Sequence, residues 1–398
     1  MRAVASRLAR AVGRSRGRGT VLLLSHPDGK LPVERSKMAA DAGFDVTWFW
    51  WWKPKLDLVD QATWLSRRVF LPPLGRSRGL VAPARFLFEH LRSQPCVVHL
   101  HYALTGADQE RWMRLARPLI VTAMGGDIFP DQGFRGEFVE PTTRLLQRAD
   151  IVTSKSRFMD ARLQELGVAP ERIRRITWGL DLSRFRSGLD TRALAREHGV
   201  SVDDTVFFCP RMCVANSNKD LVLRAFARCV DRVKGKRRAK LLVSEYLGDR
   251  ACLDSLHRLA GELEVGEHVR FVGEIPSDRM PEYYNLADAV VSVARSDGMP
   301  QTVYQAAACG SFLLLGDIPQ LAELYDLGVQ ARRVSVADER ELADAMCRVA
   351  NHRRAARESG LANRAAVLPL ADQQQQSQAM ARIYEELLER SLPRRLGL

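Results

Sequence analysis

The segment at residues 294–310 carries the residue types most suited to binding chemistry. An apolar run just before it predicts a buried strand, which ends in a turn bearing Asp297 and Gly298. A helix is expected to begin soon after Pro300, with Gln305 early on it. Because the unpaired N–H groups at a helix start attract anions and hydroxyl-rich ligands, the segment predicts that such a ligand binds beyond the strand end.

The length and composition of the chain indicate a folded protein with two domains. Its 398 residues exceed the roughly 250 to 300 residues at which a single core stops growing. Hydrophobic residues make up 46% of the chain and charged residues 27%, as in folded proteins generally. No run approaches the roughly 18 to 20 apolar residues that a membrane-spanning helix needs.

Charge is distributed unevenly along the chain. Residues 1–185 contain 30 Lys and Arg against 18 Asp and Glu, so +12 of the formal net charge of +13 lies there. A positively charged half of this kind would be expected in a protein that binds nucleic acid, an anionic membrane or an acidic substrate. Because the sequence has no Lys/Arg-aromatic module, we expect no nucleic-acid partner. Residues 1–20 hold six arginines, no acid and no long apolar run, which predicts a basic tail rather than a secretory signal. The alternative is a transit-like or surface-binding segment.

The cysteines are odd in number, scattered and without a paired Cys-x-x-Cys spacing. We therefore expect reduced thiols, most of them buried, and no metal site. The seven are Cys96, Cys209, Cys213, Cys229, Cys252, Cys309 and Cys347.

Alternating short apolar runs and amphipathic stretches predict two α/β domains with mostly parallel sheets. In the first half we expect strands at 21–25, 45–50, 96–101, 119–123 and 151–154. The pattern restarts in the second half, with strands at 205–209, 239–245, 269–272, 289–293 and 311–315. The expected organisation is a tail (1–20), an N-terminal domain (21–185), a linker (186–204), a C-terminal domain (205–371) and a helix packing back on the body (372–398). Since doubly wound sheets bind ligands at the carboxyl ends of their strands, the expected site is a cleft between two facing lobes.

Several motifs, in order along the chain, resemble those of the retaining family-4-type glycosyltransferases of the GT-B fold, also called glycosyl transferases group 1. The family hallmark is Glu-Gly-Phe-Gly, an apolar stretch and then Glu-Ala-Met-Ala-Cys-Gly, and residues 297–310 keep its register without a gap. The sequences at 149–154, 177–185, 208–211 and 269–273 match further family motifs at the right distances. The resemblance implies two facing Rossmann-like domains with a cleft between them and no metal or other cofactor.

The resemblance also implies a site for a nucleotide-sugar donor in the C-terminal half. Asp297 stands at the first motif Glu, which contacts the donor sugar, and Gln305 at the second, which contacts the nucleotide ribose. Arg211 and Lys219 stand at the two cations that clamp the donor diphosphate and neutralise its developing charge. Gln305 lacks the charge that strengthens a hydrogen bond to a ribose hydroxyl, so the donor is expected to bind more weakly or with altered specificity. The full donor set implied is Gly29, Arg211, Lys219, Gly273, Glu274, Asp297, Gly298, Met299, Pro300, Gln301 and Gln305.

On the N-terminal side the match to the family is weaker. The loop after the first strand, which in the family holds glycines near the diphosphate, here has Gly29 alone. Many relatives carry a His that faces the transferred sugar, where this chain has Met124, which cannot relay a proton. Asp127 is the first candidate for a polar group there and His101 the second; a core role is the alternative for His101 and for His99, which shares its strand face.

The mechanism that the resemblance implies is front-face attack with retention, in which the departing phosphate takes the proton of the acceptor hydroxyl. That route depends on positioning and charge stabilisation more than on a strong base. The predicted catalytic residues are Asp127, His101, Arg211, Lys219 and Asp297.

An aromatic run, Trp-Phe-Trp-Trp-Trp at 48–52, is followed by Lys53 and Lys55. Alternation divides the run between two faces, so some indole is expected near the strand end and exposed. Trp favours the bilayer interface and Lys favours anionic head groups, which predicts peripheral contact with an anionic membrane to reach a lipid-linked acceptor. The alternative is a core strand whose aromatic end stacks on sugar or on neighbouring residues.

Taken together, the sequence predicts a cytoplasmic, metal-independent hexosyltransferase, peripheral on the inner face of the membrane, that uses a UDP- or GDP-sugar and a glycan or lipid-linked acceptor. Gln305 and Met124 leave a second hypothesis open, a catalytically degenerate sugar-nucleotide-binding or scaffold protein on the same fold. A sugar-nucleotide epimerase is a third hypothesis, but no acids or histidines are placed for elimination.

Overall fold

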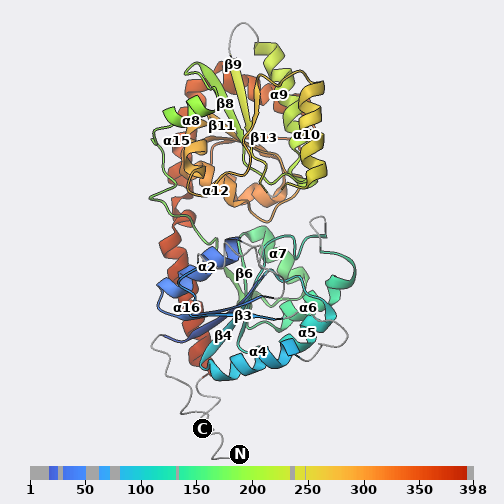
Figure 1. The fold of residues 1–398 in the computed structure, drawn as a ribbon, viewed down its shortest axis with the longest axis vertical. Helices are drawn as coiled ribbons and strands as arrows, with labels where there is room; N and C mark the ends of the chain where they lie inside the picture. Colours follow the sequence, from blue (N-terminus) through green and yellow to red (C-terminus); the bar gives the residue numbers. More distant parts are fainter. Residues whose placement is uncertain are drawn as a thin grey trace, which may run out of the picture. The chain divides into compact units, whose positions relative to one another are not determined.

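The computed structural model describes residues 18–25, 30–50, 62–71, 81–130, 134–233, 238–246 and 248–391, which form two compact units (Figure 1). The first unit comprises the residues up to Trp178 together with those from Gln374 onward, and the second comprises Gly179–Gln373. The boundary thus lies before residue 185, and the stretch 186–204, expected as a linker, belongs to the second unit.

The first unit is built on a seven-stranded parallel sheet with the order β3-β2-β1-β4-β5-β6-β7. The sequence order reverses at β1, which pairs with both β2 and β4, so that Leu23 lies between Trp48 and His99. The strands are β1 Thr20–Leu24, β2 Asp45–Trp50, β3 Arg67–Phe70, β4 Cys96–His101, β5 Leu119–Thr122, β6 Ile151–Ser154 and β7 Ile173–Arg175. The α-helices are α2 Lys30–Asp41, α4 Val81–Arg92, α5 Ala107–Met113, α6 Val139–Arg148, α7 Arg157–Glu165 and α16 Gln373–Ser391.

The core of the first unit has two layers, one on each face of the sheet. Along β1, Leu22 and Leu24 belong to one layer and Val21 and Leu23 to the other, because successive side chains of a strand point to opposite faces. The C-terminal helix α16 covers the second layer with Met380, Ile383, Tyr384, Leu387 and Leu388. The last helix among the described residues therefore completes the N-terminal unit.

Trp48, the first residue of the aromatic run, is a core residue of this layer. It is fully buried, and its indole N–H donates to Ser25 Oγ at 2.8 Å, which satisfies the polar end of the ring. Phe49 is also fully buried. These two side chains fit the core alternative, while residues 51–55 lie outside the described residues and their contact with a membrane stays a prediction.

The second unit is built on a six-stranded parallel sheet with the order β10-β9-β8-β11-β12-β13. Its strands are β8 Asp204–Cys209, β9 Arg238–Val243, β10 Val269–Phe271, β11 Ala289–Ser292, β12 Phe312–Gly316 and β13 Ala331–Val334. Its α-helices are α8 Arg192–Glu197, α9 Lys219–Val233, α10 Arg250–Glu262, α11 Met280–Leu286, α12 Gln301–Ala308, α13 Ala322–Asp326, α14 Glu339–Asn351 and α15 Arg353–Ala371. Helices α9 and α10 pack on one face of the sheet, and α12 and α15 on the other (Figure 1). Helix α14 belongs to the first of these layers and α11 to the second. Two parallel sheets with helices on both faces confirm the predicted α/β class.

The chain closes the second unit where it enters and leaves. Leu180 and Asp372 form an isolated parallel bridge, with Leu180 N donating to the carbonyl of Ala371 at 2.6 Å. Gly179, just before the bridge, has a φ of +62°, and a Cβ there would lie 2.4 Å from Gln373 Cα. Only glycine fits this close approach without displacement of the backbone.

Candidate functional site

The candidate donor residues of the second unit follow the carboxyl ends of its strands. Arg211 comes just after β8 and Asp297 follows β11, and these two strands are neighbours in the sheet. Arg211 Nη2 and Asp297 Oδ2 form an ion pair of 2.5 Å, with side chains only 12% and 14% exposed. Arg211 Nε is buried and has no hydrogen-bond partner among the described residues, so one N–H of this guanidinium is left unsatisfied.

Asp297 also shapes the loop that leads into α12. Its Oδ1 accepts the backbone N–H of Met299 at 3.1 Å, and Met299 adopts a φ of +139°, which non-glycine residues rarely do. Pro300 follows as the residue preceding the helix and provides no side-chain cap. The helix start predicted from the sequence is therefore present, with its first N–H groups uncapped by a side chain.

Thr302 and Gln301 occupy the first turn of α12. Thr302 Oγ1 is buried, with no hydrogen-bond partner among the residues the structure covers. Gln301 Nε2 donates to the carbonyl of Gly179 at 3.4 Å, so Gln301 ties this turn to the start of the unit. The sequence prediction named Gln301 as a donor contact and did not name Thr302, whose buried hydroxyl is seen only in the structure.

Lys219 begins α9 and is 3% exposed. Its ammonium donates to the carbonyl of Ser244, which follows β9, the neighbour of β8 on the side away from β11. The buried charge is thus held at the same edge of the sheet as Arg211. Buried cations at this edge make it favourable for an anion.

The loop after β10 contains Gly273 and Glu274. Gly273 has a φ of +67°, and its N–H donates to Glu245 Oε2 at 3.1 Å, while its carbonyl accepts the N–H of Glu245. Glu274 is exposed. The two predicted donor residues Gly273 and Glu274 therefore lie just after the end of β10, in a loop that is hydrogen-bonded to Glu245, the second residue after β9.

Gln305 lies on α12, and its side-chain carbonyl is already engaged. Tyr284, from α11, donates its hydroxyl to Gln305 Oε1 at 2.9 Å. Tyr284 is fully buried, and burial holds the pKa of its hydroxyl well above the ordinary value, so it acts as a donor. Sequence reasoning assigned Gln305 to a ribose hydroxyl and missed Tyr284, which competes for the same oxygen.

Asp127, predicted as a polar group facing the transferred sugar, is fully buried in the first unit. Its carboxylate accepts three backbone N–H bonds of 2.6 to 2.9 Å, from Ala103, Met124 and Gly125. Burial raises the pKa of Asp127, and these N–H groups oppose the rise. Through these bonds the Asp127 carboxylate holds the loops after β4 and β5 together. The structure gives no support to the prediction that Asp127 is catalytic.

His101 is 2% exposed and packs at a tilted angle against His99 and Trp178, with ring centroids 4.2 and 5.2 Å away. Burial, then His99, then Arg35 push the pKa of His101 well below its ordinary value, so the ring is neutral at physiological pH. Among the described residues its Nδ1 has no hydrogen-bond partner. The prediction that His101 is a catalytic residue stays untested, and its burial favours the alternative of a core histidine.

His99 belongs to a buried polar chain across the sheet. Its Nδ1 lies 2.7 Å from Tyr384 Oη and its Nε2 2.7 Å from Thr122 Oγ1, which in turn lies 2.6 Å from Thr153 Oγ1. One ring nitrogen donates and the other accepts, because burial and Arg35 lower the pKa of His99 to about 3. His99 therefore has a structural role that ties α16 to β4, β5 and β6.

Arg35, on α2, is a residue that the sequence prediction missed. Its guanidinium donates to Met124 Sδ at 2.8 Å and lies 4.7 Å from the centre of the Trp178 ring. A buried cation thus stands beside the position where many family members carry His. Gly29, the remaining predicted donor contact of this unit, lies outside the described residues.

Among the described residues no group of three or more His, Cys, Asp or Glu could hold a metal ion. No helix in the described part of the chain is long and apolar enough to cross a bilayer. Five of the seven cysteines are buried, and Cys252 and Cys347 are partly exposed.

Comparison with family models identifies the class to which this fold and site belong. The model described as Glycosyl transferases group 1 matches residues 203–352, and the model described as Glycosyltransferase Family 4 matches residues 33–184. The chain belongs to the family-4-type glycosyltransferases of group 1, and the resemblance seen in the sequence motifs is confirmed.

Curated relatives match over part of their length. D-inositol 3-phosphate glycosyltransferase 2 from Catenulispora acidiphila is 30% identical over 63% of this chain and 61% of its own. A GDP-mannose-dependent alpha-(1-6)-phosphatidylinositol monomannoside mannosyltransferase from Mycolicibacterium smegmatis is 27% identical over 44% of this chain and 46% of its own. The chain therefore spans less than two thirds of the length of these relatives.

Solved structures share the fold over most of the chain. The crystal structure of HepE from Anabaena in complex with UDP and glucose has a TM-score of 0.79 and 16% identity, and covers 93% of this chain and 100% of that chain. Sucrose-phosphate synthase from Thermosynechococcus elongatus has a TM-score of 0.76 and 18% identity, and covers 94% and 100%. At such identities the likeness shows the fold alone, which is the GT-B fold.

Proposed function

We propose that this protein is a metal-independent glycosyltransferase that moves a hexose-type sugar from a UDP- or GDP-sugar to a glycan or lipid-linked acceptor, with retention at the anomeric carbon. The observation that carries the proposal is the Arg211–Asp297 ion pair at the ends of β8 and β11, with the Lys219 ammonium held at the end of β9. Two buried cations and one paired carboxylate at one sheet edge suit a diphosphate joined to a hydroxylated sugar.

In the proposed reaction the bond between the anomeric carbon and the diphosphate oxygen breaks while the acceptor oxygen bonds to that carbon from the same face. The proton of the acceptor hydroxyl passes to the departing diphosphate oxygen. Arg211 and Lys219 stabilise the charge that develops on the diphosphate, and Asp297 orients Arg211 and accepts from a sugar hydroxyl. No protein base is required for this route, which is consistent with Met124 in the place of a histidine.

An acidic acceptor is supported by the charge of the N-terminal half, where +12 of the net charge lies. The names of the two relatives quoted above both specify acceptors that contain phosphorylated inositol. We propose an acceptor of this chemical class, reached in the cytoplasm by a protein that contacts the membrane peripherally. The same positive charge would favour both the acceptor and an anionic membrane surface.

The proposal is tested by calorimetric titration with UDP and GDP, followed by incubation with the corresponding sugar donors and NMR analysis of products. Wild type is expected to bind one nucleoside diphosphate and to release sugar with retained configuration. Arg211→Gln is expected to weaken that binding at least about tenfold, because a charge-assisted contact is lost. Arg224→Gln, an exposed change on α9, is the matched control and should leave it unchanged.

A non-catalytic sugar-nucleotide-binding protein is the second candidate, favoured by the engagement of Gln305 by Tyr284. Binding of the nucleotide without turnover of any donor, in the presence of phosphorylated inositol acceptors, would support it. Conversion of a sugar nucleotide into its epimer without an acceptor would instead support the epimerase hypothesis.

A further inference from the structure

A pocket of about 630 Å³ opens in the first unit, at the amino ends of β5, β6 and β7. His101 is the last residue of β4 and Met124 follows β5, so both lie at the carboxyl ends of these strands, at the opposite edge of the same sheet. The pocket is thus remote from the residues assigned to the transferred sugar. Its lining is dominated by five arginines, Arg117, Arg148, Arg172, Arg174 and Arg390.

The acids of the pocket do not balance these arginines. Asp150 is one of two carboxylates in the lining, and it is shared between Arg117, at 3.2 Å, and the backbone N–H of Leu119, at 2.8 Å. Arg390 pairs outside the lining, with Glu386 at 2.6 Å. Within the lining only the carboxylate of Glu171 remains for Arg148, Arg172 and Arg174, while Arg148 also faces Glu110, outside the lining, at 3.5 Å.

Arg172 and Arg174 are bound only through neutral carbonyls in the described part of the chain. Arg172 Nη1 donates to the carbonyl of Gln147 at 3.1 Å, and Arg174 Nη1 donates to that of Ile173 at 3.2 Å. No described carboxylate lies within 4.0 Å of either guanidinium. Each therefore retains N–H groups in the fork geometry that matches a phosphate.

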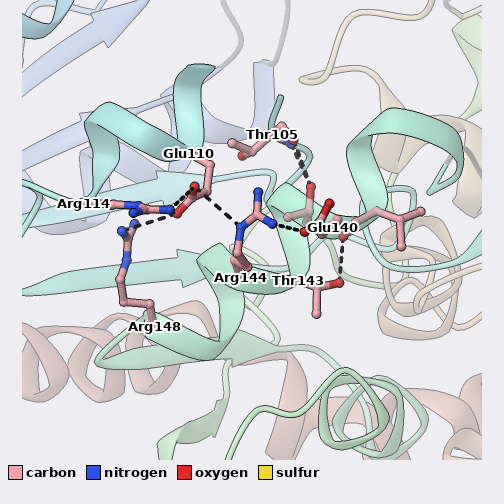
Figure 2. Close-up of polar contacts among 9 residues, drawn as sticks. Thr105, Glu110, Arg114, Glu140, Thr143, Arg144 and Arg148 are labelled. Carbon is pink, nitrogen blue, oxygen red and sulfur yellow. Dashed lines mark hydrogen bonds and ion pairs between the residues drawn. The ribbon is translucent and has the colours of Figure 1, made fainter. Parts of the chain in front are cut away.

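Arg148 adds a buried charge whose compensation is incomplete. Among the described residues none of its three guanidinium nitrogens has a hydrogen-bond partner, and its nearest carboxylate is Glu110, at 3.5 Å. Glu110 is already bonded by Arg114 at 3.1 and 3.2 Å and also faces Arg144 at 3.7 Å (Figure 2). Three arginines thus share one carboxylate beside the pocket wall, and Glu140 offsets only Arg144 (Figure 2).

We propose that this arginine pocket is a binding site for a ligand with two or more phosphate charges, contacted by Arg117, Arg172 and Arg174 and stabilised by the field of Arg148. A volume of about 630 Å³ is within the range of small-molecule sites and exceeds that of a single phosphate ion. The ligand is either a soluble phosphate ester or anhydride, or the head group of a phosphorylated lipid. The inference does not depend on the nucleotide-sugar activity, because the two sites share no residue.

The test uses inorganic pyrophosphate as the soluble probe and vesicles of phosphatidylcholine containing phosphatidic acid as the lipid probe. All proteins carry Arg211→Gln, so that the proposed donor site contributes little to pyrophosphate binding. Hydrogen–deuterium exchange locates the bound probe, and calorimetry or co-sedimentation measures its affinity. The pocket variant is Arg172→Gln with Arg174→Gln, which removes two charges without breaking an ion pair of the described residues.

The control variant is Arg111→Gln with Arg135→Gln, an equal change of charge at two exposed arginines of the same unit outside the pocket. We expect pyrophosphate or the vesicles to protect residues 144–151 and 170–176, and the pocket variant to bind at least about tenfold more weakly than the control variant. If pyrophosphate gives this protection and this difference between the variants, the ligand is a soluble phosphate compound. If only the vesicles give them, the ligand is a lipid head group. Equal affinity of the two variants for both probes, or equal protection by chloride at matched ionic strength, would overturn the proposal.

Discussion

The Arg211 guanidinium and the Asp297 carboxylate lie 2.5 Å apart, at the ends of neighbouring strands in the sheet of the second unit. Either side chain alone would be a costly buried charge, and in the pair Arg211 Nε still lacks a hydrogen-bond partner among the described residues. This pair therefore couples the residue proposed to bind the diphosphate to the residue proposed to bind the sugar.

Asp297→Asn is expected to separate nucleotide binding from turnover. Loss of the carboxylate releases Arg211 for the diphosphate, so the affinity for UDP or GDP alone should stay the same or rise. Turnover of the whole donor should fall roughly 10²-fold, because the oriented contact to the reacting sugar is lost. Calorimetry and steady-state kinetics measure the two quantities, and Asp297→Glu, which keeps the charge, is the control. A parallel loss of binding and turnover in Asp297→Asn would contradict this assignment.

Gln305→Glu is expected to strengthen nucleotide binding. A carboxylate at this position would accept the Tyr284 hydroxyl, now 2.9 Å from Gln305 Oε1, and still offer an oxygen to a ribose hydroxyl as a charge-assisted bond. We expect a gain of about threefold to tenfold in UDP or GDP affinity. Gln305→Ala should lose affinity by a similar factor. Unchanged nucleotide affinity in both variants would show that the side chain of residue 305 only accepts the Tyr284 hydroxyl and does not contact the nucleotide.

The buried histidines predict a loss of stability in mild acid. Burial and Arg35 lower the pKa of His99 to about 3 in the folded protein, against 6.5 for an ordinary histidine. Below pH 6.5 the unfolded chain binds a proton at this residue that the folded chain does not. The free energy of unfolding should therefore decrease by about 1.4 kcal/mol per pH unit per histidine as the pH falls from 6.5 towards 3.

Urea denaturation of wild type and His99→Gln between pH 7 and about pH 4 measures this slope. The variant loses one titrating group. Its free energy of unfolding should therefore change less steeply with pH, by the contribution of about one proton, even if its stability at pH 7 is lower. His352→Gln, which removes an exposed histidine, is the control for the loss of a histidine side chain as such. Equal slopes for His99→Gln and wild type would mean that His99 titrates normally.

Gly179→Ala is expected to destabilise the second unit. The added Cβ would lie 2.4 Å from Gln373 Cα and 2.5 Å from its N, and φ is +62°. The neighbouring backbone must shift, and we expect a cost of roughly 1 to 3 kcal/mol, visible as a lower melting temperature. Gly188→Ala is the matched control, because Gly188 has a φ of +81° but no atom within 4 Å of the added Cβ. If the melting temperature of Gly179→Ala is no lower than that of Gly188→Ala, the backbone around the Leu180–Asp372 bridge can shift to accept the added Cβ at little cost.

The sequence determined ten of the strands and the edge of each sheet at which a ligand is expected, but β3, β7 and β13, which lie at the sides of the two sheets, were not predicted. Apolar runs of strand length and helical periodicity depend on near neighbours in the chain, so the parallel α/β class and the turn, Pro300 and helix after β11 were predicted and are confirmed. The family was also read from local motifs and is confirmed by the matched models. The roles of the individual donor residues remain predictions.

Tertiary structure alone decided which polar groups remain available to a ligand. Asp127 is committed to backbone N–H groups, Gln305 accepts from Tyr284, and His99 is bonded to Tyr384, which lies 285 residues away. The arginine pocket likewise assembles the end of α6, the start of β7 and the end of α16. Hydrogen bonds and burial depend on packing between segments distant in sequence. A residue's type and local spacing therefore do not reveal which group its side chain bonds in the folded protein.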